Sequence, residues 1–216
     1  LRYLRSGSKE LLTAFDYEVF GISSTISKEK NPSFMAAFAV DTELDYNSHK
    51  IILEEGYKMF ENIFDYKSKS FIAPNYTWNN NHETVLNDLG IKYLQGSLVQ
   101  NSPHPNQVIK SKHHYSGEVN ENDQIYMVRN CFFEPSTNMN KDWVDSCLND
   151  INNAFKKNKP AIICSHRVNF IGSIVPENRD NNLKMLKSLL ESIVSKWPNV
   201  EFLTSDQLGK IIKEDS

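Results

Sequence analysis

Hydrophobic residues recur at helical spacing from about residue 47 onward. Asn47 or Ser48 can cap a first helix, whose apolar positions are Ile52, Met59, Phe60 and Ile63. A second stripe predicts a helix over about 141–157, with these apolar positions: Val144, Cys147, Leu148, Ile151, Ala154 and Phe155. The same reading predicts helices near 80–89 and 180–196, and a last helix capped by Ser205.

Short apolar runs between these helices predict strands at 69–73, 91–94, 124–128, 160–164 and 200–203. The polar segment from about 96 to 122 contains Pro103, Pro105 and Gly117, and it predicts a long loop. The first 45 residues show a less regular pattern, which predicts helices around 11–15 and 34–40.

Strands that alternate with helices of this length are typical of an α/β domain with a largely parallel sheet, either open or closed into a barrel. The length of 216 residues fits a single domain over 1–216. Only about five strands are predicted, and a parallel sheet needs both of its faces covered. We therefore expect the N-terminal strands of the sheet to lie outside this chain.

The composition bears on two questions: which partners the chain can bind, and whether its cysteines form disulfides or a zinc site. The formal net charge of −3 gives no bulk electrostatic reason to bind nucleic acid or an anionic membrane. No apolar stretch approaches the roughly 20 residues that cross a bilayer. Three widely spaced cysteines without a C-x-x-C pair exclude a disulfide scaffold and a cysteine-rich zinc site. Burial is the expected state of all three thiols, and a Cys164–His166 dyad is the alternative for one of them.

Polar residues follow three of the predicted strands at their carboxyl ends. In parallel α/β folds these ends gather the functional groups at one edge of the sheet. The sequence therefore predicts a substrate-binding site from three clusters: Pro74, Asn75, Tyr76 and Trp78; Arg129, Asn130 and Glu134; and His166, Arg167 and Asn169.

Each of these residues also has a structural interpretation. His166 suits proton transfer near neutral pH, but it follows an apolar strand and could be a hydrogen-bonded core histidine. Arg129 and Glu134 could bind a polar substrate or pair with each other. The aromatic rings of Tyr76 and Trp78 suit the apolar faces of sugars, or they pack at the rim of the sheet.

Several segments resemble the polysaccharide deacetylases, the family 4 carbohydrate esterases. The stretch 71–79 (FIAPNYTWN), followed by a helix and by Leu89–Tyr93 (LGIKY), is similar to the middle of that family. Residues 162–166 (IICSH) resemble its final strand motif, and 197–209 resemble its closing strand and helix. The resemblance covers about 48–212 and implies an incomplete or distorted (β/α) barrel of the deacetylase type.

The resemblance also implies a chemistry. Members of the family hydrolyse N-acetyl or O-acetyl groups on carbohydrates with a divalent metal, usually zinc, and an aspartate base. His166 would be the acid that protonates the leaving group. Pro74, Asn75 and Tyr76 would lie beside the carbohydrate, where a backbone N–H can stabilise the oxyanion. A secreted or periplasmic location follows from the family alone.

The chain departs from the family pattern in its metal ligands. The paired aspartates and the H-x-x-x-H motif are absent, Ile72 stands at the usual arginine, and Asn75 is near the usual tyrosine. We therefore expect the metal ligands upstream of residue 1 and no metal on this chain. The alternative is a catalytically inactive carbohydrate-binding protein on a degenerate deacetylase scaffold.

Overall fold

The computed structural model describes residues 7, 9–16, 36–40, 42–105 and 109–214. These residues belong to two compact units. The first is formed by Leu1–His114 with Val119–Ile125, and the second by Tyr115–Glu118 with Tyr126–Ser216. The single domain over 1–216 stays a prediction.

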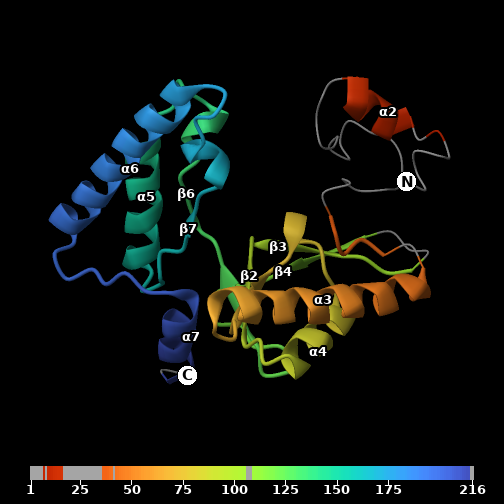
Figure 1. Ribbon diagram of the computed structural model, residues 1–216. Coiled ribbons are helices and arrows are strands. Elements are labelled where there is room, and N and C mark those ends of the chain that lie inside the picture. The colour runs from red at the N-terminus through yellow and green to blue at the C-terminus, as the bar shows by residue number, and fades with distance from the viewer. Residues whose placement is uncertain (1–6, 8, 17–35, 41, 106–108, 215–216) are drawn as a thin grey trace. The chain divides into compact units, whose positions relative to one another are not determined.

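The first unit contains α-helices, short strands and one 3-10 turn (Figure 1). In chain order its elements are α2 (Lys9–Asp16), α3 (Glu43–Phe64), β1 (Ser70–Ile72), η1 (Pro74–Tyr76), α4 (Asn80–Asp88), β2 (Tyr93–Gly96), β3 (Val99–Ser102) and β4 (Lys110–His113). Its last residue, Ile125, begins β5 (Ile125–Val128). The predicted helix around 11–15 is confirmed. Residues 36–40 are not helical, and 34–35 lie outside the described residues.

A parallel β–α–β unit forms the centre of the first unit. β1 pairs with β2 in parallel, with Ser70 opposite Tyr93, and α4 connects the two strands. The sheet order is β1-β2-β5, and the Ile125 N–H donates to the Lys92 carbonyl at 2.9 Å. Gly90 follows α4 at φ 89°, the left-handed conformation expected of a glycine at this position.

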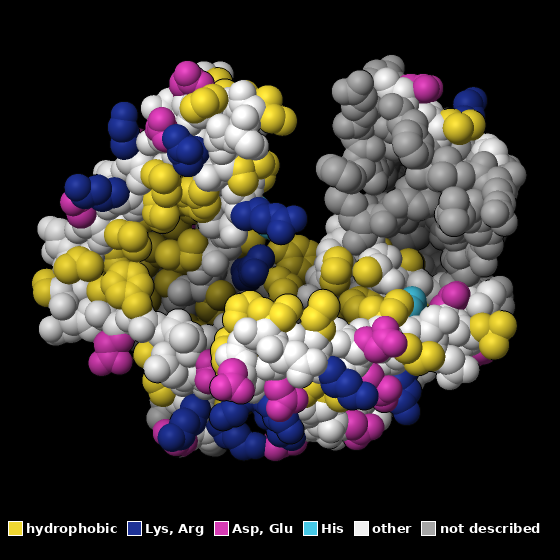
Figure 2. Space-filling model, in the orientation of Figure 1, with side chains coloured by type: hydrophobic (Ala, Val, Ile, Leu, Met, Phe, Trp, Pro, Cys, Tyr) yellow, Lys and Arg dark blue, Asp and Glu magenta, His cyan; other side chains and the backbone are white. Residues whose placement is uncertain are grey.

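The helix α3 begins before the predicted start at Asn47 or Ser48. The Thr42 N–H donates to the Asp45 carboxylate at 2.7 Å, so the capping box lies several residues upstream. The helix buries His49 and Leu53 and leaves much of its apolar stripe exposed, as Figure 2 shows along α3. The exposed hydrophobic side chains of α3 are Leu44, Ile51, Ile52, Met59, Ile63 and Phe64.

The segment predicted as a long loop contains a hairpin instead. β3 and β4 pair antiparallel, with Val99 opposite His113. Polar side chains fill the interior positions, which is why the hydrophobic pattern did not reveal these strands. Gln100 is buried, donates to the Trp78 carbonyl at 2.7 Å and contacts His114 at 2.7 Å.

Two buried histidines join α3 to α4. The ring nitrogens His49 Nδ1 and His82 Nε2 lie 3.0 Å apart, and the Asn79 N–H donates to His82 Nδ1 at 3.1 Å. Since His82 Nδ1 accepts, its neutral ring carries the proton on Nε2 and donates it to His49. Burial, and then the neighbouring His49, lowers the pKa of His82 to about 4.

The second unit holds the remaining elements. They are most of β5 with β6 (Cys131–Phe132), η2 (Pro135–Thr137), α5 (Trp143–Lys156), β7 (Ile163–Cys164), η3 (Arg167–Phe170), α6 (Pro176–Lys196) and α7 (Ser205–Glu214). β6 and β7 are parallel neighbours, connected through α5. The predicted strand at 200–203 is wrong, because these residues form no ladder, and α7 begins at Ser205 instead of being capped by it.

The core of the second unit lies between β6 and the helices α5 and α6. Its fully buried members are Cys131, Phe133, Cys147, Ile151, Leu189 and Ile193. Burial raises the pKa of the Cys131 thiol to about 12 and that of Cys147 to about 11, so both stay protonated and pack as small hydrophobic groups. The predicted burial of the three cysteines is confirmed.

The mixed α/β class is therefore confirmed, with small parallel and antiparallel sheets. Within the described parts of the chain, the strands do not close a barrel. Among the same residues, no helix is both long enough and apolar enough to cross a bilayer.

The histidine pair predicts a loss of stability in acid. The pKa of His82 is lowered in the folded state, so the unfolded chain takes up the proton first as pH falls below the ordinary value of 6.5. Protonating Nδ1 would also set a donor against the Asn79 N–H. We expect His82 to cost up to about 3 kcal/mol of unfolding free energy as pH falls from about 7 to about 4.

Urea unfolding at several pH values tests this expectation. His82→Gln keeps an acceptor for the Asn79 N–H but cannot ionise, so this variant should lose less stability in acid than the wild type. The exposed His113→Gln serves as the control and should behave as the wild type does. Equal acid sensitivity of His82→Gln and the wild type would contradict this account.

Candidate functional site

The register of two parallel strands brings Glu134 beside His166. Phe132 pairs with Cys164, so the residues two positions further along each chain also lie opposite one another. The Phe133 N–H donates to the Cys164 carbonyl at 2.9 Å and extends the pairing past β6. Cys131 and Phe133 face the helical core, so alternation directs Glu134 to the opposite face.

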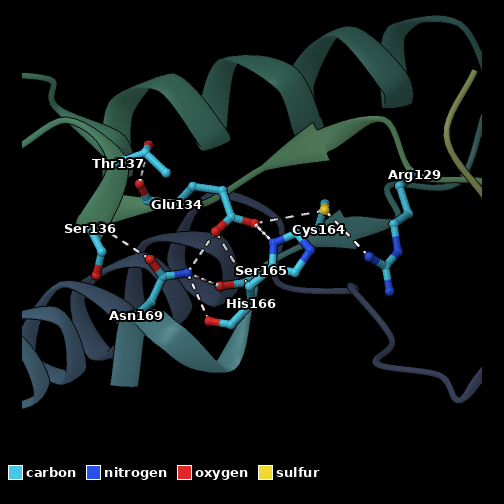
Figure 3. Close-up of polar contacts among 8 residues, drawn as sticks. All are labelled: Arg129, Glu134, Ser136, Thr137, Cys164, Ser165, His166 and Asn169. Carbon is cyan, nitrogen blue, oxygen red and sulfur yellow. Dashed lines mark hydrogen bonds and ion pairs between the residues drawn. The ribbon is translucent and has the colours of Figure 1, made fainter. Parts of the chain in front are cut away.

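Glu134 and His166 form the shortest polar contact of the site. Glu134 Oε1 lies 2.6 Å from His166 Nδ1, and the His166 N–H donates more weakly to Oε2 at 3.4 Å (Figure 3). The carboxylate side chain is only 12% exposed, whereas the imidazole is 58% exposed. A shielded carboxylate therefore holds an imidazole that reaches solvent.

Asn169 fixes the carboxylate from the other side, as Figure 3 shows. Its buried amide donates to Glu134 Oε2 at 2.8 Å and to the His166 carbonyl at 2.9 Å. Its own oxygen accepts the Ser136 N–H at 3.1 Å. The 3-10 turn η3 supplies this geometry, since it places Asn169 three residues after His166. The Asn169 side chain therefore hydrogen-bonds to residues that follow both β6 and β7, and one of these partners is the Glu134 carboxylate.

This arrangement determines which imidazole nitrogen is available. An ionised carboxylate can only accept, so the Nδ1 of His166 carries the proton that lies between it and Glu134. Nε2 is then the nitrogen that can exchange a proton with a bound molecule. The same contact fixes the orientation of the ring, as in other carboxylate–histidine pairs.

Cys164 and Arg129 complete the cluster. Cys164 Sγ lies 3.8 Å from Glu134 Oε1, and Arg129 Nη1 lies 3.4 Å from the same sulfur. The ligand atoms of Glu134, Cys164 and His166 all lie within 4.8 Å of one another, so these three residues could hold a metal ion. Thiolate, imidazole and carboxylate are the ligand types that zinc takes.

A metal ion on this cluster would change the contact between Glu134 and His166. If Nδ1 and Oε1 were both ligands, they would have to turn from each other toward the ion, because their 2.6 Å separation is shorter than the spacing of two ligands around zinc. If Nε2 were the ligand, it would no longer be available for proton transfer. The guanidinium of Arg129 also places a positive charge beside the sulfur. Proton transfer by the pair and metal binding therefore exclude each other at any one moment.

The other predicted residues of the second unit are near this cluster but have different surroundings. Asn130 joins the strands, since its Nδ2 donates to the Pro160 carbonyl at 2.9 Å and its oxygen accepts the Ile162 N–H at 2.8 Å. Arg167 is exposed at the start of η3. Of the six predicted residues in this unit, Glu134, His166 and Asn169 meet directly.

The remaining predicted residues, Pro74, Asn75, Tyr76 and Trp78, belong to the first unit. Asn75 and Tyr76 both have positive φ, at 54° and 51°, just after β1 ends. Two consecutive non-glycine residues in this conformation store backbone strain, which is common at functional sites. Trp78 is buried, and its indole N–H donates to Glu83 at 2.9 Å, so its ring packs in the interior. Pro74 is exposed at the start of η1.

Sequence reasoning left out two residues that support the site. It treated Cys164 as a buried thiol or, alternatively, as a partner of His166, whereas the sulfur also approaches Glu134. It did not consider Ser136, whose hydroxyl donates to Asn178 at 2.7 Å and accepts from Asn182 at 3.0 Å. The asparagines at 169, 178 and 182 were the available signal, because buried amides require partners.

Comparison of the chain with protein-family models, with curated proteins and with solved structures gives no match.

The central position of Asn169 predicts a large effect on stability. Asn169→Ala removes the donor to Glu134 Oε2 and the acceptor of the Ser136 N–H, both at a fully buried position. We expect a loss of about 2–3 kcal/mol in the free energy of unfolding, measured by urea titration. Asn140→Ala, at an exposed turn, is the control and should change stability little. A small loss of stability in Asn169→Ala would contradict this expectation, because it would show that these hydrogen bonds contribute little to the free energy of unfolding.

Proposed function

We propose that this chain is the C-terminal portion of a metal-dependent polysaccharide deacetylase, with His166 as the acid that protonates the leaving group. The observation that carries the proposal is the 2.6 Å contact between His166 Nδ1 and the shielded Glu134 carboxylate. This contact leaves Nε2 to face a bound molecule. An exposed imidazole that a carboxylate orients is suited to general acid–base catalysis.

The proposed reaction is hydrolysis of an acetyl group on a sugar. Water gives one proton to the aspartate base that the family pattern implies and that lies outside the described cluster, and its oxygen adds to the acetyl carbonyl carbon. The bond from that carbon to the sugar nitrogen or oxygen then breaks. The imidazolium of His166 gives its Nε2 proton to the departing amine or hydroxyl, so acetate and the deacetylated sugar are formed. Glu134 stays ionised throughout and stabilises the imidazolium through Nδ1, while Asn169 holds Glu134 in place.

The architecture supports this assignment. Helices α5 and α6 cover one face of β6 and β7, and the cluster lies on the other face at the carboxyl ends of these strands. Functional groups of (β/α) barrels occupy this position. Two β–α–β units and the sequence resemblance over about 48–212 favour an incomplete or distorted barrel of the deacetylase type.

Zinc is the cofactor that we propose. A divalent zinc ion would supply electrophilic stabilisation of the acetyl carbonyl. Because His166 cannot donate to Glu134 and bind an ion through Nδ1 at once, the proposed acid role requires zinc ligands other than Glu134, Cys164 and His166. A zinc ion on this cluster is the competing assignment, and it would make His166 a ligand.

Substitution of the pair tests the acid role. We expect His166→Ala to lower kcat for acetate release from N-acetylated chitooligosaccharides by a factor of about 10²–10⁴, with little change in KM. Glu134→Gln should cause an intermediate loss, since the amide oxygen can still accept from Nδ1 but carries no charge. His113→Ala, an exposed histidine of β4, is the matched control.

An undiminished rate in His166→Ala would contradict the acid role. Wild-type protein that binds the oligosaccharides but releases no acetate under any metal would favour the non-catalytic carbohydrate-binding alternative.

Zinc content separates the two possible roles of His166. In the full-length protein, which would carry the metal ligands that this chain lacks, we expect chelation to abolish acetate release and added zinc to restore it. We expect His166→Ala to retain the zinc content of the wild type, measured by elemental analysis after gel filtration, while its activity falls. Loss of zinc together with activity in this variant would instead identify His166 as a ligand and reject the acid role.

A further inference from the structure

A pocket of about 680 Å³ opens in the second unit beside the 3-10 turns η2 and η3. Its size is that of pockets that take small organic ligands. The lining is mainly apolar, and its principal hydrophobic side chains are Pro135, Met139, Trp143, Ile171, Ile174 and Val175.

The amide side chains at the pocket are used by the protein itself. Asn178 Nδ2 donates to the carbonyls of Val168 and Ile171 at 3.0 and 2.9 Å. Asn182 Nδ2 donates to the Asn169 carbonyl at 2.8 Å. These bonds occupy the amides of Asn178 and Asn182, whereas the side chains of Ser173, Glu177 and Asn181 also line the pocket. It is the mainly apolar lining that favours an apolar ligand.

Two large apolar side chains of the pocket lie almost fully in solvent. Met139 is 91% exposed and Ile174 is 92% exposed. Single exposed hydrophobic residues are ordinary, but two around one apolar pocket mark a surface that gains free energy when it is covered. The Nζ atom of Lys141 lies 3.9 Å from the centre of the Trp143 ring. This contact keeps the lysine charge at the side of the pocket.

The pocket adjoins the chain segments that carry Glu134 and His166, although neither residue lines it. Pro135 and Ser136 follow Glu134 directly and line the pocket, and Val168 does so two residues after His166. Asn169 connects the two places, because its amide donates to Glu134 while its oxygen accepts the Ser136 N–H. The pocket and the pair therefore share the same two chain segments.

We propose that this pocket binds an apolar chain attached to the sugar substrate, an alkyl or acyl group of several carbons, next to the group that His166 protonates. The inference rests on the proposed function for the identity of the sugar, whereas the pocket and its apolar ligand are tested by binding alone. Burial of each methylene contributes ~0.8 kcal/mol, about a fourfold gain in affinity.

The experiment is calorimetric titration of the whole chain with n-alkyl glycosides of N-acetylglucosamine, from methyl to hexyl. We expect the dissociation constant to fall roughly fourfold for each added methylene while the chain still enters the pocket. Ile174→Asp and Met139→Asp should remove this dependence, because a chain would have to desolvate the new carboxylate. Both positions are exposed, so the core is not disturbed.

Met59→Asp provides the matched control, since it places the same charge on an exposed apolar position of α3 in the first unit. This variant should keep the chain-length dependence of the wild type. An affinity that does not change from methyl to hexyl in the wild type would overturn the inference. So would a dependence that persists in Ile174→Asp and Met139→Asp, because the chain would then bind elsewhere.

The same titrations separate this inference from the proposed function. His166→Ala should lose acetate release but keep the chain-length dependence of binding. Full activity in His166→Ala would reject the acid role and leave the pocket assignment standing. Normal acetate release without any chain-length dependence would reject the pocket and leave the acid role standing.

Discussion

The parallel register of β6 and β7 is the constraint on which the second unit depends. Phe132 lies opposite Cys164, so the chain must bring Glu134 and His166 together wherever these two strands pair. The core residues Cys131 and Phe133 hold that register, because a slip of one residue would turn them out of the core and turn Glu134 into it. The packing of α5 and α6 and the geometry of the polar cluster therefore depend on the same strand register.

Partial burial of Glu134 determines the hydrogen bonds of the cluster. A carboxylate shielded from water needs donors, and His166 and Asn169 supply them at 2.6 and 2.8 Å. The first contact leaves His166 Nε2 for chemistry, and the second extends the network to Ser136 and the apolar pocket. The proposed acid and the proposed chain-binding pocket therefore depend on the same buried amide.

Much of this arrangement could be predicted from local sequence signals. The apolar stripe predicted α5, and the polar strand ends grouped Glu134, His166 and Asn169. The strand that pairs with β7 is β6, however, which lies beyond the predicted strand at 124–128. The hairpin β3–β4 was missed because polar residues such as Gln100 fill its interior and find partners only in the folded chain. The sequence could not reveal that Trp78 is buried, since only packing distinguishes a core tryptophan from one at the rim.

The most direct test of the central claim is long-range ¹H–¹⁵N correlation NMR of the histidine rings, with His166 assigned from its Ala variant. The account predicts that neutral His166 carries its proton on Nδ1, where it donates to Glu134, and that Glu134→Gln weakens this preference. A neutral ring protonated mainly on Nε2 would contradict the account, because Nδ1 would then have no proton to donate to the carboxylate.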